Sequence, residues 1–398
     1  MIGILFWLCM AGIFYVYAGY PLILTLFASF RPRPGAYDPY LPTVTLLITA
    51  YNEQEVIAAK LENSLALDYP SDRLQILVAV DGCDDRTVEI VSSFALRRVE
   101  LSYDPARRGK MAAINRAMPL VRNEILVFSD ANNFYEPSTL RELVKPFSDP
   151  MVGAVAGSKR IVQEESALGE VDSLYWRYES FIKKQETRLG SCTGVSGEVF
   201  AIRQDLFESP PDSVINDDFF LALNLIRKGF RLIYAPEACS RETGSLDERD
   251  EIVRRTRIIA GRYQAMGMSI WNLPYRRPLI VWQIFSHKFL RPLVPFAMIG
   301  AFLASFISII WVHPLGSYPL LYLSPPYHWL IFILQLLFYF LAWLGRRITI
   351  KGYLGKLLYL PTFLVNSNYA ALLGLLDYLT GKSTTIWKKA ARRGYNSD

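Results

Sequence analysis

An N-terminal stretch without any charged side chain, residues 2–30, constrains this chain more than any other feature. It is rich in Leu, Ile, Phe and Tyr, and as a helix it is long enough to span a bilayer. Arg31 and Arg33 follow at once, which favours a cytosolic position for this end of the helix. The charged start and small-residue cleavage site of a signal peptide are not evident. We therefore predict an uncleaved membrane helix over residues 1–30 with its N-terminus outside; a buried helix of a soluble domain is the alternative.

Alternating strand and helix patterns follow a Pro-rich linker at residues 31–42. The apolar strand patterns lie at residues 44–49, 74–80, 99–102 and 124–129. Their alternation with helices predicts an α/β domain over residues 43–246, with a doubly wound, mostly parallel sheet. Ligands of such sheets bind beyond the carboxyl ends of the strands, and Tyr51, Asp81 and Asp130 all lie at such ends.

From residue 247 the pattern changes to amphipathic and apolar helices. Residues 247–291 include a basic amphipathic helix that suits a membrane surface, although a helix packed on the globular domain would look similar. Residues 292–347 hold two apolar spans, which predict a hairpin that crosses the membrane and returns. For residues 348–398, which Pro361 interrupts, we predict a kinked re-entrant or interfacial pair of helices and a basic cytosolic tail.

Charge and cysteine content narrow the possible partners. The net charge of +6 arises from 43 basic and 37 acidic residues and is too small and dispersed for nucleic-acid binding, but it suits anionic membrane lipids. The four cysteines show neither metal-ligand spacing nor the density of a disulfide framework, which indicates reduced thiols on a cytosolic domain. All three histidines follow residue 280, which argues against histidine-based catalysis in the α/β domain.

The stretch ILVFSDANN at residues 125–133 places an acidic turn directly after a buried strand. Oxygens from Asp130 and Asn132 could share one hard cation, Mg²⁺ or Mn²⁺, which typically holds the phosphates of a substrate. A D-x-N sequence after a strand is more often an ordinary turn. The motifs around it are what favour the metal site.

Several motifs together carry a family resemblance. They are T-A-Y-N-E at residues 49–53, Asp81, R-G-K-M-A-A-I-N at 108–115, D-A-N at 130–132 and N-D-D at 216–218. On these motifs the chain resembles the inverting, membrane-bound family 2 glycosyltransferases of GT-A fold. That group includes the cellulose, chitin, hyaluronan and poly-N-acetylglucosamine synthases. The resemblance covers about residues 43–275 and implies a Rossmann-like GT-A domain that binds a nucleotide sugar, with transmembrane and interfacial helices.

The resemblance implies a donor site at the strand ends. Tyr51 would lie where the nucleotide base binds and could stack on uracil. Asp81 matches the aspartate that accepts the imide N–H of uracil, although Val80 stands where the family has an acidic residue. Asp130 and Asn132 match the family's D-x-D element, with Asn in place of the second Asp. The predicted nucleotide-sugar contacts are Thr49, Tyr51, Glu53, Asp81, Lys110, Asp130 and Arg257.

The same resemblance implies an acceptor site and a catalytic base. Trp176, Thr193 and Gly194 belong to segments similar to the acceptor-side loop of the family. Asp218 aligns with the aspartate of the family's T-E-D motif and is the predicted general base and acceptor contact, with Asp217 as its positioner. An inverting transfer needs one such base to take the proton of the acceptor hydroxyl. A plain pair of helix-capping aspartates is the alternative.

The family's Q-x-x-R-W element is only partly present. Arg254 replaces its Gln and Ile258 its Trp, while Arg257 matches the Arg that clamps the diphosphate. In processive synthases the Trp forms an aromatic platform for the end of the nascent polymer. Its absence favours a single-addition enzyme over a polymerase.

The predicted protein is therefore a multi-pass glycosyltransferase of the inner or plasma membrane with a cytosolic catalytic domain. It would use a UDP-sugar and a divalent metal and extend a growing polysaccharide or a lipid-linked glycan. The alternatives are a single-addition enzyme acting on a polyprenyl-linked saccharide, or an inactive scaffold of a polysaccharide-export assembly. Membrane lipids, export subunits or further copies of the chain are its predicted partners, and nucleic acid is not.

Overall fold

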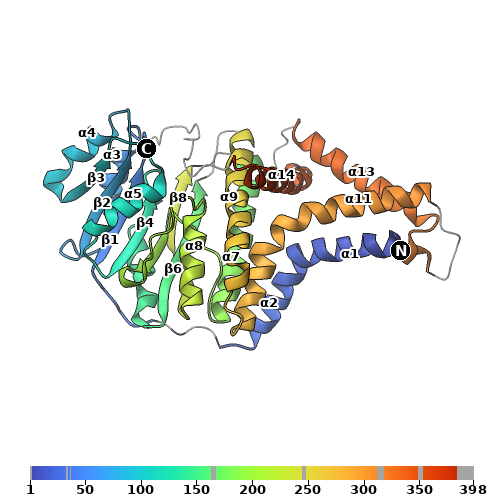
Figure 1. Cartoon of the computed structure of the whole chain (residues 1–398), viewed down its shortest axis with the longest axis horizontal. Helices are drawn as coiled ribbons and strands as arrows, with labels where there is room; N and C mark the ends of the chain where they lie inside the picture. The colour runs from blue at the N-terminus through green and yellow to red at the C-terminus, as the bar shows by residue number, and fades with distance from the viewer. Residues whose placement is uncertain are drawn as a thin grey trace.

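A computed structural model describes residues 2–32, 35, 37–162, 167–243, 248–311, 318–347 and 353–382. An α/β domain lies at one end of the molecule and an arm of long helices at the other, with the N-terminus near the tip of the arm (Figure 1). Two helices, α7 (Ala167–Arg188) and α9 (Glu248–Ser269), stand between the sheet and this arm.

The described residues form one mixed, mostly parallel sheet in the order β3-β2-β1-β4-β7-β6-β8-β5. Strands β1 to β4 run parallel to one another, and β7 is antiparallel to both of its neighbours. The bounds are β1 Val44–Ala50, β2 Leu74–Asp81, β3 Val99–Asp104, β4 Ile125–Asp130, β5 Phe134–Tyr135, β6 Val152–Val162, β7 Phe200–Arg203 and β8 Arg231–Thr243. The predicted α/β fold with a mostly parallel sheet is confirmed.

Helices cover both faces of the sheet, which explains the continuous apolar runs of its central strands. Every residue of β1 is buried. Leu46 and Ile48 of β1 pack in a core with α3, α4 and α6, whereas Leu47 faces a second core with α5 and α8. These helices are α3 Ile57–Leu65, α4 Thr87–Ser93, α5 Lys110–Ala117, α6 Thr139–Val144 and α8 Asp217–Arg227.

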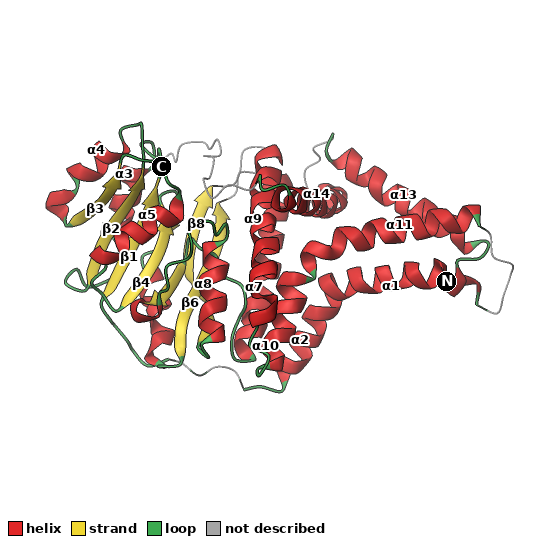
Figure 2. Ribbon diagram, in the orientation of Figure 1, coloured by secondary structure: helices red, strands yellow, loops and turns green. Residues whose placement is uncertain are grey.

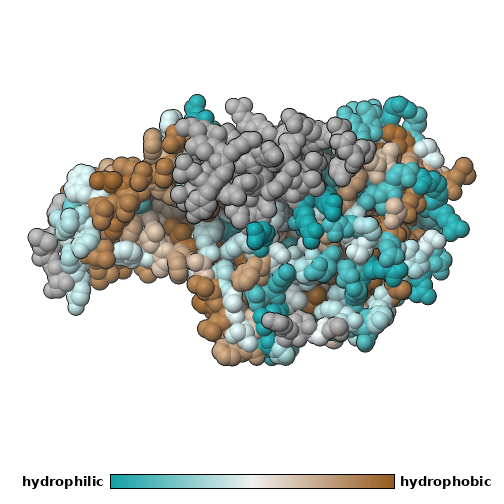
Figure 3. Space-filling model, turned by 180° about the vertical axis from the view of Figure 1, so that it is seen from behind, coloured by the Kyte–Doolittle hydropathy of each residue, from teal (hydrophilic) through white to brown (hydrophobic). Residues whose placement is uncertain are grey.

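Three helical segments among the described residues are long and apolar enough to cross a membrane. The first, Ile2–Ser29, consists of α1 (Ile2–Phe14) and α2 (Tyr20–Ser29) joined by a π-helical turn. The other two are Pro278–Ile310 and α13 (Tyr327–Gly345). Only a small share of their residues is buried, and the arm has a largely hydrophobic surface (Figure 3). Their orientation in a membrane stays a prediction.

The second of these segments begins earlier than the predicted span at residue 292. It contains α10 (Pro278–Ile284), a π-helical turn at Phe285–Phe289 and α11 (Val294–Ile310). Lys288 and Arg291 interrupt the apolar pattern in the sequence. In the fold, the Arg291 guanidinium donates a hydrogen bond to Glu179 of α7, so the helical path continues through these charges.

The expected pair of helices after residue 353 is wrong, because one helix, α14 (Tyr353–Leu379), spans this region with Pro361 inside it. Polar side chains of α14 form hydrogen bonds with the region of α13. Thr362 donates a hydrogen bond to the Ala342 carbonyl of α13 at 3.0 Å, and the Asn366 amide oxygen accepts one from Arg346 Nε at 2.8 Å. Figure 2 shows α14 beside α9 and the arm. The predicted basic tail lies outside the described residues.

Candidate active site

The loops after β1 and β2 are joined by hydrogen bonds at the carboxyl edge of the sheet. The Glu53 amide donates to Thr87 Oγ1 at 2.8 Å, and the Asn52 amide donates to Cys83 Sγ at 3.1 Å. Tyr51 is held in this corner, where the Arg107 guanidinium stacks 3.8 Å from the centre of its ring. A planar, electron-rich ring face of this kind can also accept a nucleotide base.

Asp81 organises the loop that leads into α5. Its two carboxylate oxygens accept the backbone N–H groups of Arg108 and Gly109, each at 2.8 Å, and the side chain is buried. The neighbouring Gly82 has φ +52°, and a Cβ there would lie 2.5 Å from the Arg107 nitrogen. The role of Asp81 toward uracil stays a prediction, while its hydrogen bonds give it a structural role in placing Lys110.

Lys110 and Asp130 form an ion pair between the start of α5 and the end of β4. Lys110 Nζ lies 2.7 Å from Asp130 Oδ1, and Thr49 Oγ1 donates a 3.0 Å hydrogen bond to the same oxygen. Burial disfavours the charge on Lys110, but the carboxylates of Asp130, Asp217 and Asp218 outweigh it and raise the pKa of Lys110. Lys110 therefore stays cationic beside Asp130, the carboxylate that is predicted to bind the metal.

Asp130 and Asn132 provide the oxygen ligands that a hard divalent cation prefers. The Lys110 ammonium already provides a positive charge beside Asp130, which indicates that this position attracts cations. Asn132 Nδ2 donates to Glu242 Oε1 at 3.1 Å, which fixes the amide and leaves its oxygen as the candidate ligand. No cluster of three or more His, Cys, Asp or Glu side chains suited to a metal occurs in the described residues. The residues thus fit a cation that takes its remaining ligands from substrate phosphates and water.

Asp217 and Asp218 occupy the first turn of α8. Asp218 Oδ1 accepts the Phe219 amide at 2.6 Å, and Gly197 packs against its carboxyl group so closely that a Cβ there would lie 3.4 Å from Oδ2. Burial, followed by the neighbouring charge of Asp217, raises the pKa of Asp218 to about 6. A carboxyl group with this pKa is suited to exchange protons near neutral pH.

Helix α9 fixes the segment that precedes these two aspartates. Asn216 Nδ2 donates to the Ile258 carbonyl at 2.8 Å. Gln264 accepts the Ile215 amide at 3.0 Å and donates to the Ser213 carbonyl at 2.8 Å. The helix predicted to lie on a membrane surface therefore also supports the start of α8.

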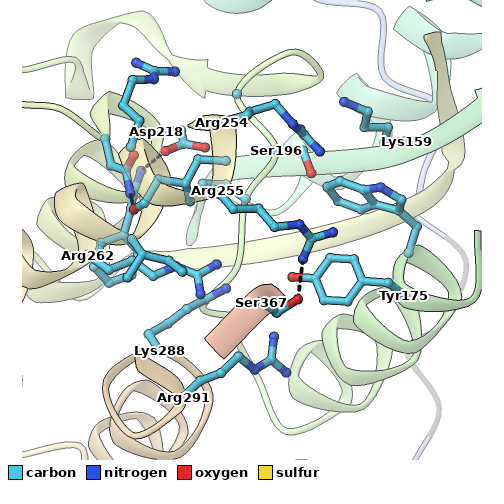
Figure 4. A pocket seen from close by; sticks show the side chains of 18 of the residues that line it. Lys159, Tyr175, Ser196, Asp218, Arg254, Arg255, Arg262, Lys288, Arg291 and Ser367 are labelled. Carbon is cyan, nitrogen blue, oxygen red and sulfur yellow. Dashed lines mark hydrogen bonds between the residues drawn. The ribbon is translucent and has the colours of Figure 1, made fainter. Parts of the chain in front are cut away.

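A cavity of about 1050 Å³ brings six of the thirteen predicted residues together. The six that line it are Lys110, Asp130, Trp176, Asp217, Asp218 and Arg257. The predicted residues at or just after the carboxyl ends of β1, β2 and β4 lie outside its wall; they are Thr49, Tyr51, Glu53, Asp81 and Asn132. Figure 4 shows Asp218 together with arginine and lysine side chains that surround the cavity, among them Arg254, Arg262 and Lys288.

Thr193 and Gly194 are absent from the cavity wall, contrary to the acceptor-site prediction. Thr193 is 1 % exposed, its amide donates to Glu186 at 2.8 Å, and its hydroxyl also contacts Glu186. Gly194 is buried against Lys288. The loop reaches the cavity two residues later, with Val195, Ser196, Gly197 and Glu198. The glycine-rich motif identified the loop, but only the packing decides which of its residues face the cavity.

A buried charge cluster in the cavity wall was missed by the sequence analysis. Lys159 forms ion pairs with Glu198, at 3.3 Å, and with Glu242, and its Nζ lies 5.3 Å from the centre of the Trp176 ring. Burial would raise the pKa of Glu198, but Lys159 lowers it below the usual value. These residues lie far apart in the chain and match no motif, so the sequence offered no spacing that could have found them.

Comparison with known proteins places the chain in a family. The family described as "Glycosyltransferase like family 2" matches residues 42–260. The chain is 26 % identical over 216 residues to the poly-beta-1,6-N-acetyl-D-glucosamine synthase of Staphylococcus aureus (strain COL), covering 53 % of this chain and 52 % of the relative. It is also 26 % identical over 263 residues to the probable glycosyltransferase YdaM of Bacillus subtilis, covering 63 % and 62 %. The chain thus spans between half and two thirds of the length of these relatives.

Among solved structures, the fold is similar to the mannosyltransferase PcManGT from Pyrobaculum calidifontis in complex with GDP-Man and Mn2+. The TM-score is 0.74 at 23 % sequence identity, with 96 % of this chain and 100 % of that chain covered. The fold is of GT-A type, and three helical segments among the described residues are apolar enough to cross a membrane. The chain belongs to glycosyltransferase family 2 and is related, at low identity, to poly-N-acetylglucosamine synthase. The predicted family resemblance is confirmed.

Proposed function

We propose that this protein transfers a sugar from a UDP-sugar, with inversion at the anomeric carbon, to a growing polysaccharide or a lipid-linked glycan at the cytosolic face of a membrane. The observation that carries the proposal is the cavity in which Asp218 and the Lys110–Asp130 pair meet. One wall then holds a proton acceptor and another holds the groups that bind a diphosphate.

Asp218 is the proposed general base. Its pKa of about 6 leaves it ionised at neutral pH but able to hold a proton during the reaction. In the proposed step the acceptor oxygen bonds to the anomeric carbon from the face opposite UDP, and its proton passes to Asp218. The bond between the anomeric carbon and the UDP oxygen breaks, and its electron pair leaves with UDP. Asp217 helps through its charge, which is the second cause of the raised pKa.

The donor diphosphate is assigned to Asp130, Asn132, Lys110 and Arg257. A divalent cation held by Asp130 and Asn132 would act as a Lewis acid toward the departing diphosphate. Lys110, now paired with Asp130 at 2.7 Å, can reach a phosphate oxygen once that carboxylate binds a cation. Tyr51 and Asp81 are assigned to the uracil end, because they lie on the strand-end loops beyond Asp130.

Ile258 bears on whether the enzyme adds one sugar or many. It lines the cavity at the position where processive synthases carry Trp. An aliphatic side chain cannot form the stacking contact that an indole makes with a sugar ring. We therefore favour a single addition to a lipid-linked acceptor over polymer synthesis, and product length distinguishes the two.

The test is UDP or GDP release by the detergent-solubilised protein with Mn²⁺, measured over a panel of UDP-sugars and GDP-mannose. We expect release from one UDP-sugar, and at least a thousandfold loss in an Asp218→Asn variant. Asp205→Asn is the matched control, because Asp205 is exposed outside the cavity wall. Turnover of GDP-mannose alone would contradict the UDP assignment. Failure of every donor, with UDP binding intact, would favour the inactive scaffold.

A further inference from the structure

The cavity wall is strongly cationic, with six basic side chains besides Lys110 and Lys159. These six are Arg254, Arg255, Arg257, Arg262, Lys288 and Arg291. Several of these already have partners, such as Arg291, which pairs with Glu179, and Arg255, which donates to Ser367 at 3.2 Å. Arg262 from α9 and Lys288 from the turn before α11 point toward one another into the cavity (Figure 4).

Arg262 and Lys288 have no carboxylate within ion-pair distance in the part of the chain that the structure describes. The nearest buried carboxylates are engaged elsewhere. Glu186 accepts hydrogen bonds from Tyr20, Thr193 and His287, and Glu179 bonds His287 and Arg291. Lys288 is only 7 % exposed. Two cations that converge at a partly buried position repel one another, and a bound anion would offset this repulsion.

The cavity also reaches the apolar arm. Its wall includes Tyr17 of the first candidate span and Pro292 of the second. Helix α14 adds an apolar surface with Leu360, Phe363, Leu364 and Ala371, and it packs against α11 and α13. The cationic pair therefore shares one cavity with Asp217 and Asp218 and with residues of helices that are suited to lipid. A neutral sugar chain would need neither the two cations nor the apolar surface.

We infer that the acceptor is a lipid whose head group carries a phosphate, that Arg262 and Lys288 bind this phosphate, and that α14 contacts the start of the acyl or prenyl chain. The inference rests on the proposed transferase function and names its acceptor class. Arginine and lysine are the usual protein ligands of phosphate. The phosphate would anchor the lipid while a head-group oxygen reaches toward Asp218.

The experiment compares lipids that differ only in the phosphate, using the full chain in neutral detergent. The probes are dioleoylphosphatidylglycerol against dioleoylglycerol, and a polyprenyl phosphate against the polyprenol, each read by the shift in melting temperature without donor. We expect a saturable shift for the phosphate-bearing lipids, with half-maximal concentration raised at least tenfold by Arg262→Gln and by Lys288→Gln. Arg276→Gln, which removes an exposed cation outside the cavity, should change nothing.

Equal shifts from the lipids without phosphate, or no response to Arg262→Gln, would overturn the inference. So would glycerol phosphate acting as well as the lipids, because the anion would then not come from a lipid. A loss of UDP affinity in Arg262→Gln as large as the loss of lipid affinity would assign the two cations to the donor diphosphate instead. Since binding is measured without donor, the result holds even if no UDP-sugar is turned over. If Lys288→Gln fails to fold, Arg262→Gln, whose residue is less buried, decides the test.

Discussion

Gly261 of α9 lies directly against the side chain of Asn216, the residue that precedes Asp217 and Asp218 of the candidate site. A Cβ at position 261 would lie 2.6 Å from Asn216 Cγ, closer than non-bonded atoms approach. The same asparagine donates to the Ile258 carbonyl at 2.8 Å. The position of Asp218 is therefore set by a close approach of two helices that glycine alone permits.

We expect Gly261→Ala to lower the kcat of sugar transfer at least tenfold, because it pushes Asn216 and the start of α8 away from α9. Gly267→Ala is the matched control on the same helix, since a Cβ there meets only the Tyr378 hydroxyl at the end of a movable side chain. Both substitutions raise helix propensity by about 1 kcal/mol, so propensity does not separate them. Equal kinetics of the two variants would contradict the proposed role of Asn216.

The pKa of Asp218 predicts the pH dependence of transfer. A general base must be ionised, so kcat should fall about tenfold per pH unit below pH 6 and level off above it. The check is a pH profile of kcat at saturating donor. In an Asp217→Asn variant the neighbouring negative charge is removed, and the midpoint should move to lower pH. A midpoint that stays in place would show that Asp217 does not influence the base.

The same pKa predicts that Asp218→Asn is more stable than the natural protein at pH 7.5. The folded state binds a proton at Asp218 more tightly than the unfolded state does, so its stabilising contribution is present below about pH 4 and is lost as pH rises through about 6. The difference at pH 7.5 is at most about 3 kcal/mol in the free energy of unfolding. Melting temperatures of the two proteins at pH 4 and pH 7.5 check this prediction. If Asp218→Asn is stabilised as much at pH 4 as at pH 7.5, the raised pKa of Asp218 is not the cause.

Asp81 should affect stability as well as donor binding. Asp81→Asn replaces one acceptor oxygen with an N–H donor that faces a backbone N–H group, at a cost of about 1–3 kcal/mol. We expect a lower melting temperature without donor, together with a raised KM for the UDP-sugar because Lys110 is displaced. Asp72→Asn is the control, because Asp72 is exposed. An unchanged melting temperature with a raised KM would indicate that Asp81 acts on the nucleotide alone.

Thr193 provides the test of the corrected acceptor site. Thr193→Val keeps the shape but removes the hydroxyl that bonds Glu186, so the free energy of unfolding should fall by about 1–2 kcal/mol. The KM for the acceptor should stay within twofold, because Thr193 does not line the cavity. Ser196→Ala, at a position that does line it, is the comparison. A raised acceptor KM at unchanged melting temperature would restore the original assignment.

The sequence alone determined the α/β fold, the family and the helices suited to a membrane. Continuous apolar strands such as residues 44–50, followed by polar turns, can only be buried between layers of helices. An apolar stretch without charge, such as residues 2–29, leaves few alternatives to a helix in contact with lipid. These properties depend on local patterns, which a sequence displays directly.

Only the tertiary structure decided which residues meet around the cavity. Whether Thr193 or Ser196 faces it depends on how the loop packs against Glu186. The pairing of Lys159 with Glu198 and Glu242 joins segments distant in the chain. The hydrogen bonds of Thr362 and Asn366 in α14 with Ala342 and Arg346 are likewise not visible in a linear pattern. Long-range packing sets such contacts, and no local spacing encodes them.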